Sequence, residues 1–320
     1  MKKTGLLLLL VASAGWALLT ANAAAQNAPD RTAPTSVSFP TERVQTPTYA
    51  DLYCAGFINK QLLPNANFVA GGLQTPNTTK FVNNDIVYLA GSGYSAGAEY
   101  EVIRELRDIN EYEVYPGQGR LMKAAGQPYA EIGRVKVIDT RSRSAIAQIE
   151  YSCDPINPGD LVIPFAEKPT IVFHAPLRFD RFLPASDRLQ GRIVLGKDFD
   201  SVLGTGMKVY MNVGANQGVK IGDYFRAVRN YTADLENPVD SLSFKASTAE
   251  DTQKRQPSID PPMFSYSTGG PVVHVRDLPR RAVGEIVVIG VTPTTSTGMI
   301  VFALEDVHAG DGVEVDPQAQ

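Results

Sequence analysis

The chain contains the same sequence pattern twice, and this repetition limits what it can fold into more than any other feature. Residues 133–160 align without a gap onto residues 284–311, and each half ends in Gly-Asp. Upstream, residues 93–105 and 218–230 share a second element, in which two glycines lie four positions apart and an aromatic residue follows the second glycine by three. We therefore expect two copies of one small domain.

The residues around the shared glycines have the composition of β-strands. Residues 85–89 and 207–211 are rich in β-branched and aromatic side chains, and long amphipathic helical patterns do not occur in the sequence. Glycine adopts positive φ easily and aspartate bonds its own backbone in turns, so both residue types predict tight turns between strands. The predicted turn residues are Gly93, Gly97, Gly159, Asp160, Gly218, Gly222, Asp223, Gly310 and Asp311. The fold class that follows is mainly β, with two tandem small β-barrels, closed or nearly closed so that no edge strand is left free.

The N-terminus has the pattern of a secretory signal peptide. Met1, Lys2 and Lys3 precede a short apolar run and then small residues, with cleavage expected after Ala23 or Ala25. The apolar run falls short of the roughly 20 apolar residues that a spanning helix needs. We therefore expect a mature protein in a bacterial periplasm or outside the cell, at most peripheral to the membrane.

Composition divides the rest of the chain. After the signal peptide (1–25), residues 26–48 are rich in Pro, Thr and Ser and predict a disordered leader. The first barrel, with an N-terminal docking segment, is predicted over 49–164, a connector over 165–181 and the second barrel over 182–316. Within the second barrel, residues 231–271 are polar and predict a mobile insertion, which is either a partner-binding loop or a tolerated surface loop.

The chain has two cysteines, Cys54 and Cys153. In an oxidising compartment an even pair favours a disulfide over two free thiols. This bond would attach the segment around Cys54 to the first repeat.

The repeats resemble a known family. Their order of strands, glycine turns and Gly-Asp ends is similar to the C-terminal SH3-like barrel of the flagellar assembly protein T family. The matching positions in the second repeat are Asn212, Gly214, Gly218, Val219, Gly222, Asp223, Phe225, Val228, Gly284, Ile286, Val288, Gly310 and Asp311. The first repeat departs from the pattern at Ala98, which replaces the aspartate after the second glycine. In that family the domain is a structural, non-catalytic part of a periplasmic flagellar ring, so the resemblance implies an envelope scaffold.

Charge and motifs disfavour several function classes. The formal net charge of −4 disfavours nucleic acid as a partner, because binding to phosphates needs clustered Lys and Arg. Gly93 to Gly97 match the G-x-S-x-G motif of serine hydrolases around Ser95, but Lys220 stands at the serine position of the second repeat. The recurring glycines therefore predict turns rather than a nucleophile. The histidines and cysteines have none of the spacings of metal sites, so we predict no catalytic residue, no cofactor and no metal; the histidines are His174, His274 and His308.

The sequence thus predicts a non-enzymatic exported scaffold or adaptor, possible partners being envelope proteins or peptidoglycan. The first alternative is a binding module for peptidoglycan or another polysaccharide, with exposed aromatic rings stacking on sugars. The candidate rings are Tyr94, Tyr224, Tyr231, Phe264 and Tyr266. A serine hydrolase at Ser95 is the second alternative.

Overall fold

The computed structural model describes residues 36–38, 44–107, 113–141, 143–229 and 279–316. The chain divides into two compact units, Met1–Val37 and Ser38–Gln320. β1 (Ser36–Ser38) lies where the two units meet in the sequence, and the other described elements belong to the second unit. The predicted signal peptide, most of the predicted leader and the predicted insertion at 231–271 lie outside the described residues. None of the described helices is long and apolar enough to cross a membrane.

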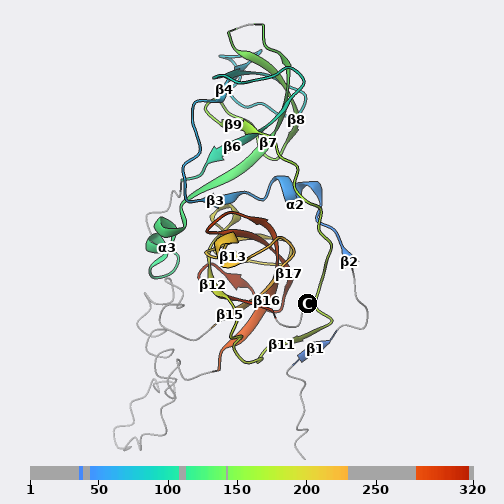
Figure 1. Cartoon of the computed structure of the whole chain (residues 1–320), viewed down its shortest axis with the longest axis vertical. Coiled ribbons are helices and arrows are strands. Elements are labelled where there is room, and N and C mark those ends of the chain that lie inside the picture. The colour runs from blue at the N-terminus through green and yellow to red at the C-terminus, as the bar shows by residue number, and fades with distance from the viewer. Residues whose placement is uncertain (1–35, 39–43, 108–112, 142, 230–278, 317–320) are drawn as a thin grey trace, which may run out of the picture. The chain divides into compact units, whose positions relative to one another are not determined.

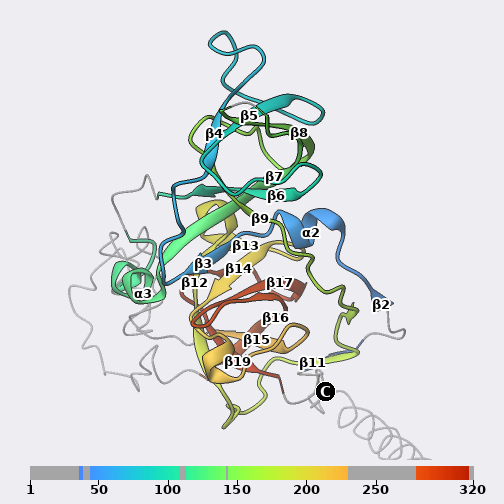
Figure 2. The same ribbon diagram turned by 45° about the horizontal axis from the view of Figure 1, so that its top comes forward.

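Six antiparallel strands close the first barrel (Figures 1 and 2). These strands are β4 (Phe68–Gly72), β5 (Ile86–Ala90), β6 (Glu99–Glu105), β7 (Gln127–Asp139), β8 (Ala145–Ser152) and β9 (Leu161–Pro164). Neighbours follow the order β7-β6-β9-β4-β5-β8, and β8 pairs again with β7. A further short strand, β3 (Phe57–Asn59), pairs with the first residues of β7.

The second barrel is also closed by six strands. These are β12 (Gln190–Gly196), β14 (Lys208–Met211), β15 (Tyr224–Arg229), β16 (Arg281–Val291), β17 (Ser296–Ala303) and β19 (Gly312–Val315). Their order is β12-β14-β17-β16-β15-β19, and β19 pairs again with β12. The prediction of a mainly β fold with two tandem small barrels is confirmed.

The two barrels have the same topology and the same strand register. If β4 to β9 are matched in order with β12, β14, β15, β16, β17 and β19, every pairing of the first barrel recurs in the second. The residue pairs agree as well, because Tyr88 lies opposite Ile146 in the first barrel and Tyr210 lies opposite Thr297 in the second. The repetition in the sequence is therefore a repetition of structure, residue by residue.

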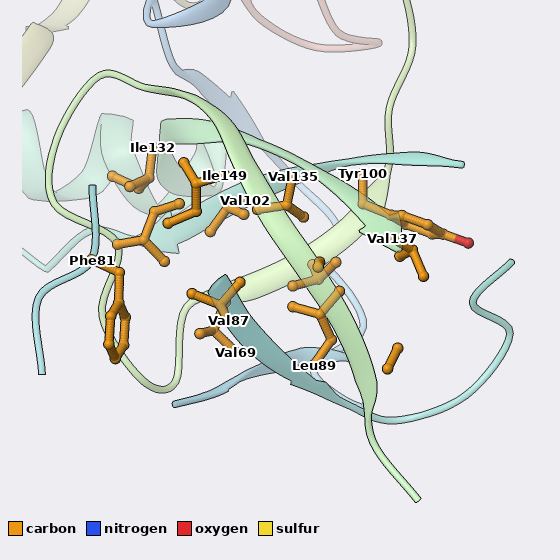
Figure 3. Packing of buried hydrophobic residues seen from close by; sticks show 14 of the residues in the cluster. Val69, Phe81, Val87, Leu89, Tyr100, Val102, Ile132, Val135, Val137 and Ile149 are labelled. Atoms are coloured by element: carbon orange, nitrogen blue, oxygen red, sulfur yellow. The ribbon is translucent and has the colours of Figure 1, made fainter. Parts of the chain in front are cut away.

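Each barrel has its own apolar interior. In β5, Val87 and Leu89 are fully buried while the residues between them face outward, as the alternation of side chains along a strand requires. Figure 3 shows how these side chains meet Val102, Val135 and Val137 inside the first barrel. The interior of the second barrel contains Phe225, which is fully buried. Burial of such side chains, at about 25 cal/mol per Å² of apolar surface, is the main term that stabilises each barrel.

The remaining elements lie outside the barrel strands. They are β2 (Val44–Gln45), α2 (Tyr49–Tyr53), α3 (Gln118–Ala125), β10 (Phe173–His174), β11 (Arg178–Asp180), η1 (Lys197–Phe199), β13 (Val202–Leu203), η2 (Ala215–Gln217) and β18 (Val307–His308). β2 pairs with β10, and β13 pairs with β18. Helix α2 begins at Thr48, whose hydroxyl accepts a hydrogen bond from the Asp51 amide while the Asp51 carboxylate accepts one from the Thr48 amide.

The predicted disulfide between Cys54 and Cys153 is confirmed. It connects the residue that follows α2 with the residue that follows β8, across a sequence separation of 99 residues. Closing so long a loop stabilises a fold by about 4 to 5 kcal/mol in the chain-entropy model, which is an upper figure. The bond fits an oxidising compartment, where disulfides persist.

Candidate functional site

The six glycines among the predicted turn residues all have left-handed backbone conformations. Their φ values are 84° at Gly93 and Gly97, 95° at Gly159, 87° at Gly218, 93° at Gly222 and 98° at Gly310. At Gly310 a side chain would also meet the ring of Tyr115, whose Cγ would lie 2.7 Å from an added Cβ. These positions therefore demand glycine for reasons of backbone geometry.

The aspartates that follow two of these glycines each bind an arginine. In the first barrel, Nε and Nη2 of Arg104 donate to the two carboxylate oxygens of Asp160 at 2.8 and 2.7 Å. In the second barrel, Arg229 donates to Asp311 in the same way at 2.9 and 2.7 Å. Each carboxylate also accepts a main-chain amide hydrogen bond at 2.7 Å from the residue three positions earlier. We call each of these pairs an Arg-Asp clamp.

The clamps connect the end of one strand to the start of another. Arg104 and Arg229 lie near the ends of β6 and β15, and the aspartates precede β9 and β19. Sequence reasoning predicted the aspartates as turn residues but missed the arginines. The sequence does contain a signal for these arginines, because both occupy the same place in the aligned elements 93–105 and 218–230.

We expect the clamp of the second barrel to contribute strongly to stability. Asp311 is buried, with a side chain 1 % exposed, so Arg229→Ala would leave a buried carboxylate without its cation. The free energy of unfolding should fall by about 3 to 5 kcal/mol, as measured by equilibrium urea unfolding. Arg141→Ala is the matched control, since Arg141 also binds an aspartate through two nitrogens but is 91 % exposed. Its effect should stay within about 0.5 kcal/mol, and equal losses in the two variants would contradict the role of the clamp.

Ser95 lies in the turn between Gly93 and Gly97. Its amide donates to the hydroxyl of Tyr100 at 3.1 Å, and its carbonyl accepts from the Ala98 amide at 3.1 Å. Of the two downstream histidines, His174 of β10 packs its ring at a tilt against Tyr224, and His274 lies outside the described residues. Each hydrogen bond found at Ser95 in the described part of the chain uses its main chain.

The other residue types considered for chemistry are also tied to structural neighbours. Burial, followed by the nearby Arg229 guanidinium, lowers the pKa of His308 below its usual value. The residues that the structure describes contain no group of three or more side chains able to hold a metal ion.

Two of the aromatic residues predicted to stack on sugars can be located, and both are half-buried. The Tyr94 hydroxyl donates to the Ala90 carbonyl at 2.8 Å, and its ring packs edge-on against Tyr100. The Tyr224 hydroxyl accepts from the His174 amide at 3.1 Å. Tyr231, Phe264 and Tyr266 lie outside the described residues. The described aromatic candidates therefore serve packing within the chain.

The residues around α2 form a segment that contacts both barrels. We call residues 48–59 the docking segment. On the side of the first barrel, besides the disulfide, Nζ of Lys168 donates to the Leu52 carbonyl at 2.6 Å and to the carboxylate of Glu131. The other oxygen of Glu131 accepts from the Gly56 amide at 3.1 Å. Glu131 is buried, and the bonds from Lys168 and from the Gly56 amide replace the hydration that its carboxylate loses.

On the side of the second barrel, three hydroxyl groups donate to carbonyl oxygens of the docking segment. Tyr210 of β14 binds Ala55 at 2.7 Å. Thr297 of β17 binds Gly56 at 2.9 Å, and Thr295, just before β17, binds Ile58 at 2.7 Å. Apolar side chains surround these bonds: Leu52 and Ala55 pack with Val287, Ile289 and Met299. The docking segment predicted for the first barrel is therefore also bound to the second.

Helix α3 makes a second connection between the barrels. It lies between β6 and β7 of the first barrel, and Tyr115, just before it, donates to the Val194 carbonyl of β12 at 3.0 Å. Gln118 donates to the same carbonyl at 3.3 Å. Ala125 of α3 and Ile58 of the docking segment pack together with Leu195 and Tyr210. Both connections are built by the first half of the chain on the surface of the second barrel.

A pocket of about 250 Å³ opens beside the docking segment. It lies between Leu52, Ala55 and Phe57 on one side and residues 289–292 on the other. Its charged lining residues are Glu131 and Lys168, which both bind the docking segment. The charged groups of this pocket thus have a structural role, because they hold the docking segment.

The hydroxyl contacts should make a measurable contribution to folding. Thr297→Val keeps the shape of the side chain but leaves the buried Gly56 carbonyl without its donor, so the free energy of unfolding should fall by about 1 to 3 kcal/mol in urea unfolding. Thr294→Val is the matched control, because the Thr294 hydroxyl is buried without a hydrogen-bond partner and its removal should be neutral or stabilising. Equal destabilisation by both substitutions would contradict the proposed role of the bond.

The two barrels carry reversed charge pairs at one equivalent place. Glu101 lies opposite Arg134 in the first barrel, and Arg226 lies opposite Glu285 in the second. Burial is the main cause that raises the pKa of Glu101 to about 8, and the nearby carboxylate of Glu131 is the second.

In the second barrel this charge pair is buried. Arg226 and Glu285 are 2 % and 1 % exposed, and Arg226 pairs with Glu314 and Asp316 at 3.9 and 3.7 Å, longer than hydrogen bonds. Arg280 supplies a closer cation, with two nitrogens 3.0 and 2.8 Å from the oxygens of Glu314. Burial first, and the nearby Asp316 carboxylate second, raise the pKa of Glu285 to about 8.

Glu285 should make stability depend on pH. Its contribution is fully present below its unfolded pKa of 4.5 and is lost as pH rises through about 8, because in this range the unfolded chain releases a proton that the folded chain keeps. Glu285→Gln should therefore gain stability relative to the native chain across this window, by up to about 1.4 kcal/mol per pH unit. Urea unfolding from pH 4 to 9 measures the difference, with Glu105→Gln, at the exposed end of β6, as the control. A difference that does not change with pH would contradict the shift.

No protein-family model matches the chain, and no curated protein matches it.

Proposed function

We propose that the chain is an exported, non-enzymatic scaffold or adaptor of the bacterial cell envelope. The observation that carries this proposal is the joint between the barrels, in which three hydroxyl groups of the second barrel bind main-chain carbonyls of a segment that a disulfide ties to the first. Such a joint holds two barrels of equal topology as one body. A body of this kind can present separate binding faces at a fixed spacing.

The chemistry of the described side chains supports the same proposal. The buried ionic groups are used in the Arg-Asp clamps, in the docking contacts and in the charge cluster around Arg226. The disulfide supports export to an oxidising compartment. The resemblance of the repeats to the flagellar assembly protein T family supports a place in a periplasmic assembly, with other envelope proteins as partners.

Cross-linking in the native cell tests this function. The tagged chain would be purified after cross-linking, and attached proteins and attached peptidoglycan would be analysed separately. We expect a defined set of envelope proteins that is missing from a control chain lacking residues 1–25, which should stay in the cytoplasm. Recovery of peptidoglycan fragments alone would replace the adaptor by a glycan-binding module. Labelling of the native chain, but not of Ser95→Ala, by an active-site serine probe would replace it by a hydrolase.

A further inference from the structure

The surface that binds the docking segment on the second barrel has a counterpart on the first. Tyr210, which donates to the docking segment, corresponds to Tyr88, because β14 and β5 have the same register against β17 and β8. By the same register Thr297 corresponds to Ile146. The internal repeat therefore places one tyrosine and one β-branched residue side by side on each barrel, facing outward.

The counterpart surface is more open than the one that is occupied. Tyr210 is 1 % exposed under the docking segment, whereas Tyr88 is only half-buried and its hydroxyl forms no hydrogen bond within the part of the chain that the structure describes. Phe68 of β4, opposite Ala90 at the end of β5, is 37 % exposed. We call this surface the β5–β8 face; it consists of Phe68, Ile86, Tyr88, Ala90 and Ile146.

We propose that the β5–β8 face binds an extended segment of a partner protein, in the way that the second barrel binds the docking segment. The interface is the internal repeat of one that the structure already contains, in which hydroxyl groups bind main-chain carbonyls of a segment that turns at Gly56. The tyrosine donor recurs as Tyr88, while Ile146 replaces the threonine donor and offers an apolar contact in its place. This proposal rests on the adaptor function and names where such a partner is held.

The differences between the two faces define the chemistry of that partner. On the second barrel, Lys208 forms an ion pair with Asp51, and Ile86 takes the place of Lys208 on the first. The partner therefore needs an apolar residue at the position that Asp51 has in the docking segment. Opposite the tyrosine, the partner needs glycine, because a side chain at Gly56 would collide with the Tyr210 hydroxyl. The occupant is thus an uncharged, extended segment with a glycine in its middle.

A peptide with the sequence of the docking segment is the probe. We would use residues 52–59 with serine at position 54, labelled for fluorescence anisotropy, and the full mature chain with its disulfide intact. We expect saturable binding at one peptide per chain. Tyr88→Ala should weaken it about tenfold or more, as removal of a central aromatic contact does. Val202→Ala, at an exposed position of β13 outside the first barrel, is the matched control and should not change it.

A second measurement keeps the test independent of the folding of the variant. A photoreactive group at Phe57 of the peptide should cross-link to residues of β5 or β8 in the native chain, and a peptide with valine in place of Gly56 should not bind. Absence of saturable binding, or binding that Tyr88→Ala leaves unchanged, would overturn the proposal. Self-association of the native chain that Tyr88→Ala abolishes would overturn it in favour of a second copy as occupant.

These outcomes are separate from the test of the adaptor function. If the Tyr88→Ala chain still recovers the same envelope proteins after cross-linking in the cell, the adaptor function stands and only this face is excluded.

Discussion

The arrangement of this protein depends on one short segment whose main chain is bound from two sides. The disulfide at Cys54 and the Glu131–Lys168 pair hold the docking segment to the first barrel. The hydroxyls of the second barrel hold the carbonyls of the same residues. Exchanging each of these hydrogen bonds for one to water costs about 0.5 to 1.5 kcal/mol, and separating the barrels would also expose the apolar side chains that pack beside them. The joint is specific because it satisfies main-chain groups and buries apolar side chains at the same place.

The repeated features and the unique ones have different physical roles. The left-handed glycines and the Arg-Asp clamps occur in both barrels, at equivalent positions of the same topology. They close turns and tie strand ends, which every copy of the barrel needs. The pair of Glu131 in the first barrel and Lys168 in the following connector has no counterpart in the second barrel, since Ala282 takes the place of Glu131 there. Such unique residues serve the contacts that each barrel makes with the rest of the chain.

The sequence predicts the framework of the fold better than its joint. Two aligned copies, alternating strand patterns and paired cysteines were enough for the two barrels and the disulfide, because these features repeat or are local. The hydrogen bonds from Tyr210 and Thr297 connect residues that are 155 and 241 positions apart, and no periodicity along the chain predicts them. Arg104 and Arg229 could have been found, because both copies keep an arginine and a Gly-Asp at equivalent positions, and two kept residues of opposite charge are a signal of pairing. The contacts of Tyr94 with Tyr100 and of Tyr224 with His174 could not be read from residue type, because they join side chains that the fold brings together.

The reversed charge pair shows how far the two copies have diverged. An acid on β6 and a base on β7 become a base on β15 and an acid on β16, so the residue types at these two positions are exchanged between the barrels. The neighbours of Arg226 in the second barrel are Glu314 and Asp316, whereas Glu101 in the first barrel lies beside Glu131, so the same place in the two barrels is surrounded by different groups. The interior and the turns are therefore alike in both barrels, whereas the side chains on their outer faces differ. A duplicated fold with non-equivalent outer faces is suited to holding different neighbours, which is the property that an adaptor requires.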